Sequence, residues 1–149
     1  MPVTIGQYEY TLDTKNRLVV PSRYRDLLAE EKGSYFIVAR GFDGCLFLLL
    51  PSQWEKFLQE MQERAKSIPD GAKARDFKRM VFTTATEAPL DDQGRILIQQ
   101  NQKEYAGLKK DVVITGAGNK AEIWDAKRWV KTSQAAATAF QELAKDMDL

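Results

Sequence analysis

The chain has 149 residues, of which 44% are hydrophobic and 29% are charged, and its net charge of +1 does not by itself indicate a partner. Without histidine and with one cysteine, it lacks the commonest metal ligands and the usual base of an activated nucleophile, which predicts no enzyme, metal or cofactor. The longest apolar run, 45–50, is far shorter than the roughly 20 residues of a membrane helix, and the N-terminus lacks a secretion signal, which predicts a cytoplasmic protein with no membrane partner.

Short apolar segments rich in β-branched and aromatic residues predict strands in the first half of the chain. In chain order these segments span 7–12, 17–20, 34–39 and 45–50. A short helix is predicted over 21–31, between the second and third strands. A longer amphipathic helix is predicted from 51 to about 66, where Ser52 and Glu55 form the S-x-x-E pattern of a capping box.

The second half repeats this order after a linker. Pro69, Asp70 and Gly71 predict a turn in the linker, before a short basic helix. The strands that match those of the first half span 82–90, 95–98, 111–115 and 121–124. A short helix is predicted over 100–110, and Asp125 can cap a longer final helix whose alanine-rich sequence has high helix propensity.

The duplication predicts one α+β, mainly β, body. A unit of four short strands buries little core alone, so hairpins of the two units are expected to interleave around a pseudo-twofold axis. The predicted boundaries are 7–54 for the first unit, 55–82 for a covering helix and linker, 83–129 for the second unit and 130–149 for a C-terminal helix. The helices are expected to flank a barrel-like body.

A tight turn with the pattern D-x-x-x-R occurs once in each half. The first turn spans 13–17, from Asp13 to Arg17, and the second turn spans 91–95, from Asp91 to Arg95. Asn16 and Gly94 stand just before the arginines, where a hairpin loop commonly has a positive φ that these two residue types tolerate. The aspartate can accept amides of its own turn and pair with the arginine, so a structural clasp explains the spacing on its own.

The charges around the two turns differ, which suggests a second, functional interpretation. Four cations follow or lie within the first turn, namely Lys15, Arg17, Arg23 and Arg25. The equivalent stretch of the second half has two cations and two acids. Arginine on a rigid hairpin suits bidentate recognition of phosphate or guanine, although most surface cation clusters are simply solvated.

The duplicated turn and three further segments, RLVVPSRYR, RGFDGCLFLLLPSQW and AEIW, together resemble the MraZ family of bacterial transcriptional regulators. The resemblance extends from about Gly6 to Trp129. It implies two swapped-hairpin units of the AbrB/SpoVT type that form a double-psi-like β-barrel. It also implies a nucleoid-associated protein that binds double-stranded DNA at short direct repeats upstream of its own operon, the division and cell-wall gene cluster.

The resemblance further implies a ring-shaped homo-oligomer that presents several D-x-x-x-R turns together. With the surrounding charges, the predicted DNA-binding residues are Asp13, Lys15, Asn16, Arg17, Arg23, Arg25, Asp91 and Arg95, with Arg17 the foremost. Asn16 departs from the glycine usual in the family, but it tolerates the same backbone conformation. A ring suits the physics, because linked weak contacts along repeated sites raise avidity without new contacts.

Two other functions remain open from the sequence. Swapped-hairpin domains also occur in antitoxins, whose disordered acidic tails wrap a toxin, but the C-terminal segment here is short and predicted to be helical. An enzyme with Asp13 and Asp91 as paired carboxylates is a remote alternative, because each acid faces an arginine that should keep it ionised. Trp54 and Trp129 are interpreted as packing anchors, and Trp124 as either a core residue or a subunit contact.

Overall fold

The computed structural model describes residues 2–149, and its elements follow the duplicated order. The first half contains β1 (Gln7–Thr11), β2 (Arg17–Val19), α1 (Ser22–Glu30), β3 (Tyr35–Arg40), β4 (Leu46–Leu49) and α2 (Pro51–Ala65). The second half contains β5 (Thr86–Pro89), β6 (Arg95–Leu97), α4 (Gln100–Ala106), β7 (Asp111–Gly116), β8 (Ala121–Asp125) and α5 (Ala126–Met147). Helix α3 (Gly71–Thr84) lies in the connection between the halves and stands outside the repeat.

Strands of the two halves pair with one another. The main sheet has six strands in the order β1-β7-β8-β4-β3-β5, and β2 pairs with β6 in a separate two-stranded ribbon. All of these pairs are antiparallel. The equivalent strands of the two halves are β1 and β5, β3 and β7, and β4 and β8. When each of these strands is replaced by its equivalent, the same strand order results, read from the opposite edge of the sheet. The topology therefore has the pseudo-twofold symmetry that the duplication predicts.

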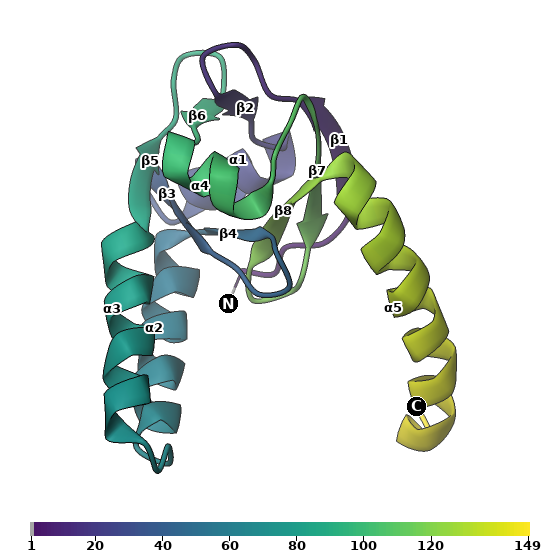
Figure 1. Cartoon of the computed structure of the whole chain (residues 1–149). Helices are drawn as coiled ribbons and strands as arrows, with labels where there is room; N and C mark the ends of the chain where they lie inside the picture. Colours follow the sequence, from purple (N-terminus) through teal and green to yellow (C-terminus); the bar gives the residue numbers. More distant parts are fainter. Residues whose placement is uncertain (1) are drawn as a thin grey trace.

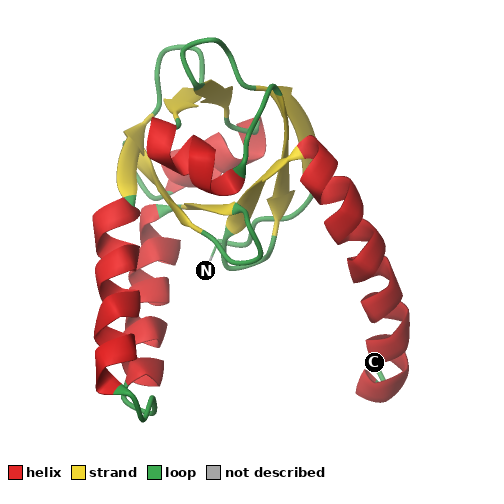
Figure 2. Ribbon diagram, viewed as in Figure 1, coloured by secondary structure: helices red, strands yellow, loops and turns green. Residues whose placement is uncertain are grey.

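The sheet is open, which corrects the expectation of a closed double-psi-like β-barrel. Strands β1 and β5 are its two edges, and β2 and β6 form a ribbon of their own. The turn between β1 and β2 is closed by the Asp13 N–H, which donates to the Arg17 carbonyl at 3.1 Å, after which the two strands diverge to partners in the other half. Figure 2 shows the curved sheet, with the ribbon over its open side and two short helices between them. These helices are α1 and α4 (Figure 1).

Apolar side chains fill the body on both faces of the sheet. The larger cluster draws on both halves and includes Leu18, Val38, Ile96 and Ile114. The smaller cluster includes Ile37, Phe47 and Trp124. Because both faces are covered, all four residues of β4 are buried without alternation. Trp54 of α2 and Trp129 of α5 pack against the smaller cluster, as predicted, and Trp124 belongs to the core.

The predicted capping box of Ser52 and Glu55 is wrong. Helix α2 begins one residue before Ser52, and the backbone N–H of Leu50 donates to Oε1 of Gln53 at 3.0 Å. Ser52 lies inside the first turn, and its hydroxyl donates to the Glu31 carboxylate at 2.7 Å. The carboxylate of Glu31, at the end of α1, thus lies at the N-terminus of α2, where its negative charge interacts favourably with the helix dipole.

Other helix ends agree only in part with the sequence. Asp70 caps α3 by accepting two backbone N–H groups, but this helix runs through Thr84, into a segment predicted to be extended. Asp125 occupies the N-cap position of α5 without capping it, because its carboxylate accepts the backbone N–H of Lys109 at 3.2 Å.

The helical arms and the two D-x-x-x-R turns lie at opposite ends of the molecule. The hairpin of α2 and α3 and the single helix α5 extend from the body as two arms, both toward the same end (Figure 1). The first and second turns lie at the opposite end, beside β2 and β6. Among residues 2–149, no helix combines the length and apolar character needed to span a membrane.

Candidate nucleic-acid interface

The β2–β6 ribbon joins the first and second turns into one surface. Its register pairs are Arg17 with Leu97, Leu18 with Ile96, and Val19 with Arg95. Leu18 and Ile96 are buried beneath the ribbon. Because strand residues alternate between faces, Arg17 and Arg95 lie on the outward face, diagonally across the ribbon. One arginine from each half is thus presented at the end opposite the arms.

Asp13 organises the first turn. Its Oδ1 accepts the backbone N–H groups of Lys15 at 2.9 Å and Arg17 at 2.8 Å, and its Oδ2 accepts Nε of Arg17 at 2.7 Å. Asn16 has φ 62°, so the predicted positive φ is confirmed. Asparagine therefore maintains a turn that glycine would also permit.

Asp91 makes equivalent bonds in the second turn. Its Oδ1 accepts the backbone N–H groups of Gln93 and Arg95, both at 2.9 Å, and its Oδ2 accepts Nε of Arg95 at 2.8 Å. Gly94 has φ 74°. The predicted structural clasp is therefore present in both halves.

Both turn carboxylates are held ionised. The hydrogen bond from the Arg17 backbone N–H is the main cause that lowers the pKa of Asp13, and Arg95 acts in the same way on the pKa of Asp91. A general acid needs a raised pKa, so these aspartates do not match the paired-carboxylate enzyme. In the described chain, 2–149, no cluster of three or more His, Cys, Asp or Glu residues is arranged to hold a metal ion.

Each turn also contacts the short helix of the other half. Nζ of Lys103 donates to Oδ1 of Asn16 at 3.2 Å, and Nδ2 of Asn16 donates to Oε1 of Gln100 at 3.2 Å. At the second turn, a Cβ built on Gly94 would lie 2.7 Å from Nη1 of Arg25. The cations of α1 and α4 thus pack over the turns in a reciprocal arrangement.

Most of the predicted site residues come together at this end. The residues gathered there are Asp13, Lys15, Asn16, Arg17, Arg25, Asp91 and Arg95. Arg23 lies elsewhere, with its Nη1 3.8 Å from the Glu30 carboxylate in a hollow that Pro2 and Val3 also line. Lys103 and Gln100 were not among the residues predicted from the sequence. The repeat held a signal for Lys103, because it follows Asp91 by the same interval as Arg25 follows Asp13.

The two arginines of the ribbon have different surroundings. Arg95 contacts both aspartates, with Nε 2.8 Å from Asp91 and Nη1 3.6 Å from Asp13. Its side chain is 21% exposed, against 36% for Arg17. The first turn adds a cation, Lys15, where the second has uncharged Gln93. Arg17 and the first turn therefore present more accessible positive charge.

Comparison with known proteins gives agreeing results over nearly the whole chain. A family model described as "MraZ protein, putative antitoxin-like" matches twice, over residues 4–78 and 81–149. The chain is similar to "Transcriptional regulator MraZ" of Heliobacterium modesticaldum, with 40% identity over 149 residues that cover 97% of this chain and 99% of that protein. It is also similar to "Transcriptional regulator MraZ" of Moorella thermoacetica, with 40% identity over 144 residues that cover 96% and 95%. The double match agrees with the internal duplication.

Proposed function

This chain belongs to the MraZ family, and from that premise we propose that it regulates transcription by sequence-specific binding of double-stranded DNA through the first and second turns. The observation that carries the proposal is the outward face of the β2–β6 ribbon, where Arg17 and Arg95 lie diagonally opposite. A two-stranded ribbon is narrow enough to enter the major groove of B-DNA, which gives this placement a direct use.

Arg17 is the proposed DNA-recognition residue. Its bond to Asp13 uses Nε, which leaves the two terminal nitrogens of the guanidinium as donors for guanine or phosphate. Asp13 accepts both the backbone N–H and Nε of Arg17, so the Arg17 side chain is already held in place. Its loss of conformational entropy on binding DNA is therefore small. Lys15, within the first turn, and Arg25, beside Gly94 of the second turn, are proposed to contact phosphates on either side.

Arg95 is proposed to have a more supporting role. It contacts two carboxylates and is less exposed than Arg17, so less of its charge is available to DNA. We assign to Asp13, Asp91 and Asn16 the fixing of turn geometry, and we propose that Arg23, which lies with Glu30 away from the turns, makes no contact with DNA.

The proposed target is a set of short direct repeats upstream of the protein's own operon, the division and cell-wall gene cluster. One ribbon supplies few phosphate contacts, so a single subunit should bind weakly and with a shallow salt dependence. A ring that presents like-oriented ribbons would favour direct repeats and gain avidity from linkage, whereas a strict twofold dimer would favour palindromes. We place this activity in the cytoplasm, at the nucleoid, and we retain 7–54 and 83–129 as the proposed duplicated units.

An antitoxin-type module that binds protein is the second candidate. The family description contains the words "antitoxin-like", which is the observation in its favour. Against it, the C-terminal segment is an ordered helix that runs to Met147, whereas a toxin-wrapping tail is expected to be disordered and acidic.

The test is DNA binding by wild type, Arg17→Ala and Arg23→Ala on a promoter fragment from upstream of the gene, with intact or scrambled repeats, at two salt concentrations. We expect Arg17→Ala to lose the preference for intact repeats and to weaken binding to them by at least about tenfold, because each specific contact contributes about 1–3 kcal/mol. Arg23→Ala is the matched control, since it removes the same charge from a residue that lies with Glu30.

Folding and assembly are checked in each variant by circular dichroism and sedimentation. If folded Arg17→Ala keeps the full preference for intact repeats, the D-x-x-x-R turn is only a structural clasp and the proposal is wrong.

A further inference from the structure

Helix α5 carries an apolar face that residues 2–149 leave uncovered. All residues over 134–149 are exposed, and the exposed fractions of Phe140, Leu143 and Met147 are 69%, 55% and 63%. Their spacing of three and four residues places them on one side of the helix, next to Ala144. The charged residues Glu142 and Asp146 fall on the other side. Such a helix is amphipathic in the manner of a surface that packs against another protein element.

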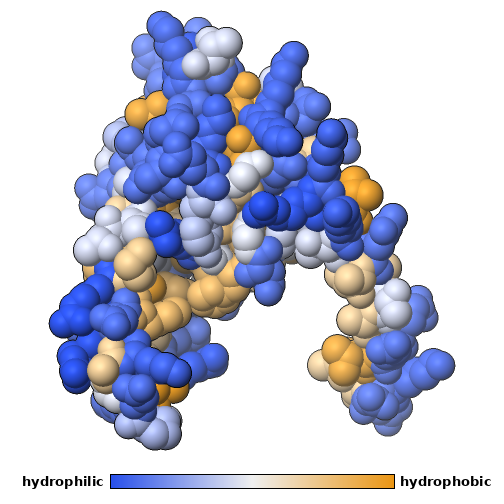
Figure 3. All heavy atoms as spheres, viewed as in Figure 1, coloured by the Kyte–Doolittle hydropathy of each residue, from blue (hydrophilic) through white to orange (hydrophobic). Residues whose placement is uncertain are grey.

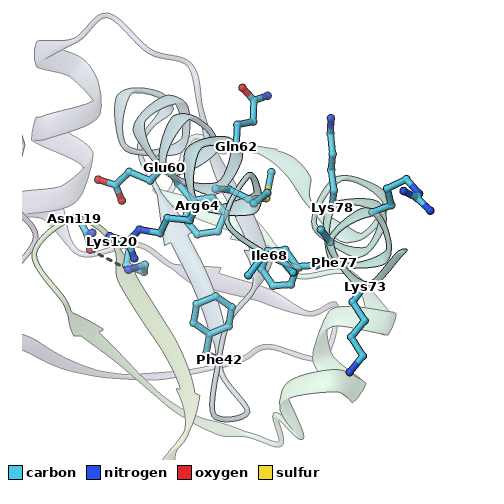
Figure 4. Close-up of a pocket in the computed structure, with 15 residues that line it drawn as sticks. Phe42, Glu60, Gln62, Arg64, Ile68, Lys73, Phe77, Lys78, Asn119 and Lys120 are labelled. Atoms are coloured by element: carbon cyan, nitrogen blue, oxygen red, sulfur yellow. Dashed lines mark hydrogen bonds between the residues drawn. The ribbon is translucent and has the colours of Figure 1, made fainter. Parts of the chain in front are cut away.

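An apolar groove of about 720 Å³ lies along the other arm, between α2 and α3. Phe42, from the loop between β3 and β4, points into it together with Ile68 and Phe77 of the helical arm (Figure 4). These three side chains are 50%, 48% and 46% exposed. Apolar side chains with this much exposed surface, in a groove between two helices, are typical of sites that bind the apolar face of a further helix.

The duplication relates the two arms. Helices α2 and α5 follow β4 and β8, which are equivalent strands, so they occupy equivalent places in the two halves. Helix α3 lies against α2 along the first arm, but α5 stands alone in the second (Figure 1). The first arm therefore has a partner helix and a groove, whereas the second has an apolar face against which no helix of residues 2–149 packs.

Charges on the two surfaces are complementary. Cations dominate the rim of the groove, namely Arg64, Lys73, Arg75, Lys78 and Lys120, with one acid, Glu60. The outer end of α5 carries Glu142, Asp146 and Asp148, with one cation, Lys145. The net negative charge of this end of the chain and the net positive charge of the rim therefore attract each other at long range, which speeds encounter between subunits.

We infer that α5 of one subunit docks in the α2–α3 groove of the next, and that this contact builds the oligomer. Docking within one chain does not fit the shape, because the arms stand on opposite sides of the body (Figure 1). Figure 3 shows apolar surface on both arms, on the sides that face the space between them. Helix and groove are different surfaces, so the contact is heterologous and can propagate from subunit to subunit until a ring closes. This inference rests on the ring in the proposed function and supplies its interface.

The first experiment is sedimentation velocity without DNA. The helix variant is Phe140→Glu with Leu143→Glu, and the groove variant is Ile68→Glu with Phe77→Glu. We expect wild type to sediment as a closed oligomer and each variant as a monomer of about 17.0 kDa. The control variant adds the same two glutamates to the polar side of α5, as Thr138→Glu with Gln141→Glu, and should keep the wild-type mass.

Mixing the helix and groove variants tests whether the contact is heterologous. The helix variant keeps an intact groove and the groove variant keeps an intact α5, so the mixture should form a dimer of one copy of each and nothing larger. Pairing of α5 with α5, or binding of α5 to another protein class, would leave the groove variant at wild-type mass. Either that result or a mixture that stays monomeric overturns the inference.

A disulfide trap avoids dependence on the folding of the groove variant. The native Cys45 is buried, so two single-substitution proteins, Leu143→Cys and Phe77→Cys, each present one accessible thiol. When they are mixed and oxidised, we expect a covalent dimer that contains both. An oligomeric wild type that gives no such dimer contradicts this interface but leaves the ring standing. A monomeric wild type contradicts both, while the Arg17 test still decides DNA recognition separately.

Discussion

The first and second turns have the same hydrogen bonds but different charges. In each, an aspartate binds two backbone N–H groups and the arginine Nε, at distances that agree within 0.1 Å. Between aspartate and arginine, however, the first turn has Thr14, Lys15 and Asn16, where the second has Asp92, Gln93 and Gly94. The bonds that close the turn are the same in both halves, whereas all three residues between the aspartate and the arginine differ.

This difference separates the structural role of the turn from its proposed role in recognition. Within residues 2–149, Asp13 forms ion pairs with both arginines of the ribbon, whereas Asp91 forms one with Arg95 alone. Arg95 is consequently more enclosed than Arg17. We expect stability to depend on both turns, and DNA recognition to depend mainly on the first.

An exchange of turn sequences should have the largest effect on DNA binding. The triple variant Thr14→Asp, Lys15→Gln and Asn16→Gly gives the first turn the chemistry of the second while keeping the aspartate and arginine. It loses one cation and gains one acid, so we expect at least about tenfold weaker binding to intact repeats and a salt slope smaller by about one unit. Fluorescence anisotropy over a salt series measures both quantities.

The reciprocal exchange is the control for that prediction. Asp92→Thr with Gln93→Lys, which keeps Gly94 because a Cβ there would meet Arg25, should leave binding unchanged or strengthen it, since the change adds positive charge next to Arg95. Equal losses in both exchange variants would mean that turn charge does not distinguish the two halves.

The residues at positive φ should differ in their effect on stability. Gly94→Ala places a Cβ at φ 74° and 2.7 Å from Nη1 of Arg25, so we expect the free energy of unfolding to fall by about 1–3 kcal/mol. Asn16→Gly keeps an allowed backbone at φ 62° and should change stability by less than about 1 kcal/mol. Urea denaturation measures both, and a milder effect of Gly94→Ala would show that the second turn can relax.

Acid should weaken the first turn more than the second, and this is the smallest of the expected effects. The pKa values of Asp13 and Asp91 are lowered in the folded protein, mainly by backbone N–H groups, from an ordinary value of 3.8. The unfolded chain therefore takes up protons first as the pH falls. Stability from these carboxylates is complete above that value and is lost as the pH falls through the lowered, folded-state pKa.

Substitution of each aspartate by asparagine separates the contribution of Asp13 to acid sensitivity from that of Asp91. Because Asp13 also contacts Arg95, Asp13→Asn should flatten the acid side of the curve of melting temperature against pH more than Asp91→Asn does. Equal flattening would indicate that the contact between Asp13 and Arg95 adds nothing measurable.

Local features were predictable from the sequence because local chemistry determines them. The element order followed from apolar segments and turn residues, and the positive φ of Asn16 followed from its place before the arginine. Pairing partners could not be predicted, since an apolar strand pattern does not specify which distant strand it meets. Two side-chain hydrogen bonds were unpredictable for the same reason, because only folding brings their partners together. They join Lys103 to Asn16, and Glu31 to Ser52 at the start of α2.

The pairing of β1 with β7 also affects how the protein is made. Register places Gln7 opposite Thr115, so the first strand to leave the ribosome has its partner among the last segments synthesised. At about 5–20 residues per second, β1 waits for several seconds until β7 has been synthesised, whereas β3 and β4 can already pair within the first half. Non-local pairing of this kind also slows the folding step itself. The nascent chain therefore passes through a stage at which its unpaired segments are open both to chaperones and to aggregation.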